Sequence, residues 1–121
     1  MLPAKNTEEL LQSITIENLY VQLIAQLNKD FQLANVAASF DIANSPTELK
    51  KQLFAVLLNL ITKQYDDYLN LLYRIDVPES DLAKLKNDNL TTSMEEITYL
   101  VLKREYQKVW FKHNFDKIQG K

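Results

Sequence analysis

Side chains able to carry nucleophilic, redox or metal chemistry are scarce in this chain. Its 121 residues include no Cys, a single His and a single Gly. Without Cys there is no thiol nucleophile, disulfide or thiolate metal site. P-loops and dinucleotide-binding turns need several glycines, and zinc or di-iron helix motifs need at least two histidines. We therefore predict a protein that is not an enzyme, with no catalytic residues, no cofactor and no metal.

The remaining titratable pairs each have a structural explanation. Asp66 and Asp67 are neighbours in sequence, as are Glu95 and Glu96, and neighbours on a helix point roughly 100° apart, so they do not face each other. Asp66 is predicted to face solvent, and the glutamates to open a helix, where the macrodipole favours anions. His113 follows aromatic residues on one helix face, so we predict a partly buried histidine rather than a ligand or a base.

Helix-start signals recur along the chain, and the near absence of Gly and of alternating apolar patterns argues against a sheet. Asn6, Thr15 and Ser93 are candidate caps, and Ser45-Pro46-Thr47-Glu48 is the strongest capping sequence. The predicted helices cover about 7–13, 16–36, 46–75, 78–87 and 94–118. We predict an all-α fold, an irregular helical bundle that forms a single domain over residues 1–121.

The 46–75 helix is predicted to be the centre of this bundle. Its apolar residues cover more than half of its circumference, so it must be packed on two sides. Gln64 projects into that apolar face, where a buried amide needs hydrogen-bond partners. A nearby Tyr hydroxyl or loop carbonyl would satisfy it. Alternatively, Gln64 lines a pocket, and the protein binds a small ligand there.

The last helix carries two apolar stripes. The continuous stripe is predicted to face the core, and it contains Tyr99, Leu102, Tyr106, Val109, Trp110 and His113. Cations interrupt the second stripe, which contains Ile97, Leu100, Val101, Phe111, Phe115 and Ile118. We predict that the second stripe contacts a protein partner or a second copy of the chain. The expected interaction surface consists of Ile97, Val101, Arg104, Lys108, Phe111, Lys112 and Phe115.

Charge is spread unevenly along the chain. Residues 103–121 carry six Lys/Arg and two Asp/Glu, whereas residues 1–102 carry eight and fourteen. Cations interleaved with aromatic residues are typical of nucleic-acid surfaces, but the net charge of −2 opposes phosphate binding. Our leading hypothesis is a non-enzymatic protein-interaction module, homodimeric through the C-terminal helix. The alternatives are nucleic-acid binding through that basic helix and ligand binding near Gln64.

Two stretches carry a resemblance to known proteins. Residues 72–79, read as LYRIDVPE, and residues 101–108, read as VLKREYQK, form a hinge followed by a charged helix. In this hinge Asp76 is predicted to cap the next helix. The chain resembles a group of small all-helical bacterial proteins of unknown function, which implies a cytoplasmic helical domain. The N-terminus reads MLPAKNTEELLQS, which is not a secretory signal, and no apolar run spans a bilayer, so we expect no membrane partner.

Overall fold

The computed structural model describes residues 5–85 and 89–115. Its helices are α1 (Thr7–Ile16), α2 (Tyr20–Leu33), α3 (Pro46–Lys63), α4 (Tyr65–Ile75), α5 (Glu79–Ala83) and α6 (Leu90–His113). No strand occurs in either described range. The predicted all-α bundle is therefore confirmed.

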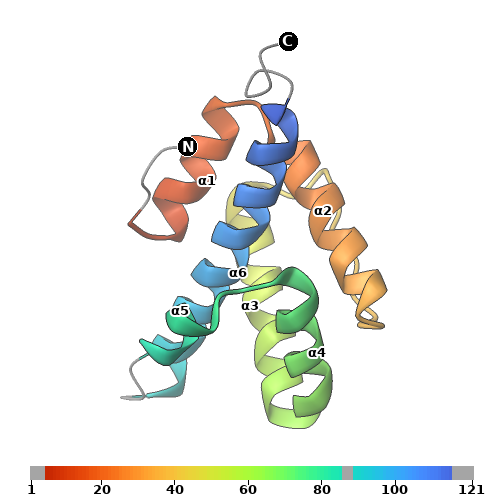
Figure 1. Ribbon diagram of the computed structural model, residues 1–121, viewed down its shortest axis with the longest axis vertical. Helices are drawn as coiled ribbons and strands as arrows, with labels where there is room; N and C mark the ends of the chain where they lie inside the picture. The colour runs from red at the N-terminus through yellow and green to blue at the C-terminus, as the bar shows by residue number, and fades with distance from the viewer. Residues whose placement is uncertain (1–4, 86–88, 116–121) are drawn as a thin grey trace.

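The central helix is α6, not the predicted 46–75 helix. Figure 1 shows α6 running through the middle of the molecule, with α1 and α2 beside one half and α3 and α4 beside the other. Its main packing partners are α1, α2, α3 and α4. Buried side chains from these five helices form one core cluster. The prediction of a central 46–75 helix is wrong because that segment is broken in two, and each part covers α6 from outside.

The break lies at Gln64, whose backbone leaves the helical region with φ −142° and ψ 61°. Beyond it, α4 lies beside the C-terminal part of α3 instead of extending it (Figure 1). Each part then buries a stripe of its own at helical spacing: Leu49, Leu53, Leu57 and Leu60 on α3, and Tyr68, Leu71, Leu72 and Ile75 on α4. The break therefore explains how one segment can be apolar over most of its circumference.

The boundary between the first two helices lies further along the chain than predicted. α1 continues to Ile16, and the Thr15 hydroxyl donates to the Leu11 carbonyl at 2.8 Å instead of capping the next helix. Asn18 then adopts φ 61°, a left-handed conformation that Asn tolerates better than most residues. Ile16, the last residue of α1, lies in solvent just before this turn, with 72% of its surface exposed.

Side-chain caps fix three helix starts. The predicted Asn6 cap is confirmed, since its Oδ1 accepts the Glu9 N–H at 2.9 Å. At α3 the predicted capping box is complete: Ser45 Oγ accepts the Glu48 N–H at 3.2 Å, and Glu48 Oε1 accepts the Ser45 N–H at 2.8 Å. The start of α6 was predicted at Ser93, but the cap is Asn89, so α6 begins one turn earlier.

The capping box yields a stability prediction. Ser45→Ala leaves the Glu48 N–H without its acceptor and should lower the free energy of unfolding by about 1 kcal/mol. Thr47→Ala, in the same exposed first turn, is the matched control and should change it by less than about 0.5 kcal/mol. Urea denaturation followed by circular dichroism measures both. Equal stability of the two variants would contradict a working cap.

Candidate functional site

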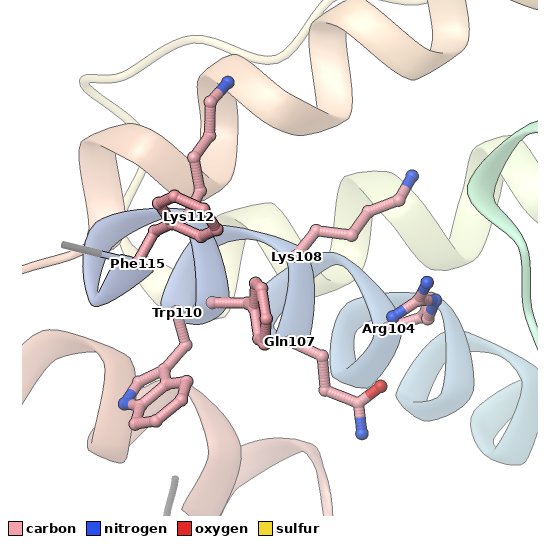
Figure 2. A pocket seen from close by; sticks show the side chains of 7 residues that line it. Arg104, Gln107, Lys108, Trp110, Lys112 and Phe115 are labelled. Carbon is pink, nitrogen blue, oxygen red and sulfur yellow. The ribbon is translucent and has the colours of Figure 1, made fainter. Parts of the chain in front are cut away.

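Two exposed aromatic residues lie at the C-terminal end of α6: Phe111 in its last turn and Phe115 just beyond its last residue, His113. Their side chains are 54% and 46% exposed, and their ring centroids lie 6.4 Å apart. The rings belong to an open hollow of about 840 Å³ on the C-terminal half of the helix. It is lined by Arg104, Gln107, Lys108, Trp110, Phe111, Lys112 and Phe115. Figure 2 shows Lys108 and Lys112 projecting to one side of α6 and Trp110 to the other. This Phe111–Phe115 face is the candidate site.

Two members of the expected interaction surface belong to the core instead. Ile97 is 5% exposed and Val101 is fully buried, so neither can contact a partner. The prediction was wrong for these two because α6 is covered on both apolar sides by other helices. Leu102, Tyr106 and Val109 of the predicted core stripe are buried as expected. Ile118 lies outside the described residues.

His113 is exposed, contrary to the prediction of a partly buried histidine. It lies in the last turn of α6. It lines a second hollow, of about 290 Å³, between α2 and α6.

Arg104, expected on the interaction surface, is held by the end of α4. Its Nε donates to the Asp76 carbonyl at 3.0 Å, and its Nη2 donates to Asp76 Oδ2 at 3.2 Å. Asp76 does not cap α5 as predicted, because Pro78 occupies that cap position. Asp76 instead ends α4 in the left-handed conformation, with φ 71°. Arg104 therefore satisfies an end-of-helix carbonyl and joins α4 to α6.

Lys108 is paired with two acids that the sequence analysis did not single out. Its Nζ lies 2.7 Å from Asp30 Oδ2 on α2 and 3.4 Å from Glu105 Oε1 one turn back on α6. Gln26 Nε2 donates to the same Asp30 oxygen at 3.2 Å. The Asp30 carboxylate is 5% exposed and the Glu105 carboxyl is fully buried. These contacts join α2 to α6 immediately below the Phe111–Phe115 face.

The two acids differ in their protonation: the pKa of Glu105 is raised, and that of Asp30 is lowered. Burial raises the pKa of Glu105 to about 9, the neighbouring Asp30 carboxylate adds to the rise, and Lys108 opposes it. Burial also tends to raise the pKa of Asp30, but interactions with Glu105, Lys108 and Gln26 outweigh it, and the net pKa is lowered. At neutral pH Glu105 is therefore a neutral acid and Asp30 a carboxylate.

Gln64 is exposed at the break between α3 and α4, so its amide is not buried among leucines as predicted. It does line a hollow of about 350 Å³. The segment that follows α2 also lines it, including Val36 and Ala38. Among the described lining residues Asn35, Asn59 and Gln64 are amides and Asp67 is the charged residue, so the lining has polar groups for binding but no paired acid and base.

Two other classes of site are absent from the described residues. Across residues 5–85 and 89–115, no group of three or more His, Cys, Asp or Glu side chains is placed to hold a metal ion. In the same ranges, none of the helices has both the length and the apolar character that crossing a bilayer requires.

Comparison with known proteins identifies no relative of this chain: no family model, curated protein or solved structure matches it. The resemblance to small all-helical bacterial proteins therefore stays a prediction. The interpretation of the site depends on the contacts and exposures described above.

Glu105 yields a prediction of pH dependence. The folded protein holds a proton on Glu105 up to a pKa of about 9, whereas an ordinary glutamate releases it near 4.5. This group therefore lowers stability progressively as the pH rises from about 4.5 to about 9. Glu105→Gln keeps the shape and a donor but does not titrate. It should match the wild type near pH 4.5 and exceed its free energy of unfolding by up to about 5 kcal/mol at pH 8.

Chemical denaturation at several pH values measures this difference. Glu95→Gln, an exposed change on the same helix, controls for the loss of one carboxylate. A Glu105→Gln variant that is less stable than the wild type at pH 8 would show that Glu105 is needed there as an anion.

Proposed function

We propose that the protein is a non-enzymatic protein-interaction module that binds its partner through the Phe111–Phe115 face of α6. The observation that carries this proposal is the exposure of two large aromatic rings on the central helix of the bundle. Every other large apolar side chain of α6 between Met94 and Val109 is buried or half-buried. Apart from Leu90 at the opposite end of α6, which is 53% exposed, the two rings are the large apolar side chains at this helix left for an outside contact.

The energetics of such a contact are favourable. Fully burying one Phe side chain stabilises a complex by roughly 1.5–3 kcal/mol, and about half of each ring is still available to be covered. Aromatic side chains are enriched in the fully desolvated centres of interfaces, where a few residues supply most of the binding energy. A rim of cations beside two apolar rings matches this organisation.

Nucleic-acid binding is the alternative, and the pairing of the cations weakens it. Arg104 is bound to Asp76, and Lys108 is bound to Asp30 and Glu105, so both carry carboxylate partners already. Lys103 lies over the Tyr99 ring, with Nζ 5.9 Å from its centroid. Phosphate binding needs several cations that release counterions together. On the Phe111–Phe115 face, Lys112 is the cation that has no such pairing among the described residues.

The proposal predicts the outcome of removing both rings. Phe111→Ser with Phe115→Ser should leave a folded protein, because both rings are about half exposed, and should abolish partner binding. Leu69→Ser with Tyr73→Ser, two exposed side chains of α4, is the matched control and should keep binding. Affinity capture from native lysate after nuclease treatment, together with sedimentation velocity, measures both.

Three outcomes decide the proposal. Proteins retained by the wild type and the α4 control but lost by the α6 variant support it, as does a wild-type dimer that the α6 variant converts to a monomer. Unfolding of the α6 variant would show that the face belongs to the core. Identical retention by all three proteins, or retention that nuclease abolishes, would contradict a protein-binding face.

A further inference from the structure

The Phe111–Phe115 face is continuous with the second hollow. Lys112 lines both: on one side it borders the phenyl rings, and on the other it borders the groove between α2 and α6. That groove is lined by Gln22, Ala25, Gln26, Lys29, Val109, Lys112 and His113. A bound segment can therefore contact the rings and the α2 side of the groove at the same time.

The charged side chains that the structure describes around these two hollows are all positive. Among the described residues, the charged side chains that line them are Arg104, Lys108, Lys112 and Lys29, with no Asp or Glu. Arg104 and Lys108 have carboxylate partners within the protein. Lys112 and Lys29 are exposed, and neither forms an ion pair within the described residues. In a chain with a net charge of −2, the two unpaired lysines lie together along the α2 side of the rings.

We infer that the occupant of this face is an acidic, apolar segment of another protein. Its apolar side chains would cover Phe111 and Phe115, and its carboxylates would pair with Lys112 and Lys29. This inference rests on the proposed function and adds the chemistry of the partner. Opposite charges across an interface steer encounter and suppress wrong partners, while the apolar centre supplies most of the affinity.

A second copy of the chain fits the face less well. A two-fold contact brings the same patch of each copy together. Lys112 would then meet the cations of the other copy's face, and within residues 5–85 and 89–115 no carboxylate lines either hollow to neutralise them. Like charges placed opposite each other across an interface are destabilising. The charge distribution therefore favours a different, acidic protein over a symmetric homodimer.

Site-specific photo-crosslinking tests this inference on the full chain. Phe111 is replaced by p-benzoylphenylalanine, and the tagged protein is irradiated in native lysate after nuclease treatment. Tyr73, an exposed aromatic residue of α4, receives the same probe as the matched control. Mass spectrometry then identifies the peptides joined to each probe.

We expect crosslinks specific to position 111, to segments that contain a large apolar residue and several more Asp/Glu than Lys/Arg. A synthetic peptide of the crosslinked segment should bind about tenfold more weakly to Lys112→Glu. Lys51→Glu, an exposed change of equal charge on α3, should bind it as the wild type does.

Failure of the inference about the partner can be distinguished from failure of the proposed function. Crosslinks from position 111 to a neutral or basic segment, or to the chain itself, overturn the inference while the face stays an interaction site. Equal affinity of the peptide for Lys112→Glu and Lys51→Glu also overturns only the inference. Position 111 without any crosslink beyond those of the Tyr73 control overturns the proposed function.

Discussion

The structure depends on the burial of α6 from two sides. This helix carries apolar residues around most of its circumference between Met94 and Val109, and four other helices cover them. Burial on this scale also encloses Glu105, whose carboxyl stays neutral beside Asp30 and Lys108. Placing one acid in the core is tolerable because only Asp30 of the pair ionises, and the Lys108 ammonium lies 2.7 Å from it.

The same burial determines what α6 presents to solvent. Two of its cations form ion pairs with carboxylates outside α6: Arg104 with Asp76 at the end of α4, and Lys108 with Asp30 on α2. Beyond Val109 the surrounding helices no longer cover the full circumference, so Phe111 and Phe115 remain exposed. The candidate face is thus the uncovered continuation of the second stripe, whose Ile97 and Val101 are buried, with Lys112 at its edge. A helix that is buried over most of its length therefore ends beside two exposed aromatic rings.

Local signals predicted the parts of this fold that depend on local interactions. The Asn6 cap and the Ser45–Glu48 capping box follow from side chains within one helical turn, and the structure contains both. The break at Gln64 depends on how α3 and α4 share the cover of α6, and no nearby Gly or Pro announces it. The burial of Ile97 and Val101 also depends on how the helices pack together. Periodicity predicts an apolar stripe on a helix but does not tell which helix of the chain covers it. Glu105 carried one signal, its position four residues after Val101 and before Val109, but its partner Asp30 is remote in sequence.

The central claim is that α6 is enclosed as far as Val109 and open at Phe111 and Phe115. The chain contains no Cys, so single-cysteine variants along α6 report accessibility without background. The measurement is the rate at which an aromatic disulfide reagent labels Ile97→Cys, Val101→Cys, Phe111→Cys and Phe115→Cys under native conditions. We expect the first two to react at least about a hundredfold more slowly, since labelling them requires local opening of the core. Comparable rates at all four positions would contradict the account.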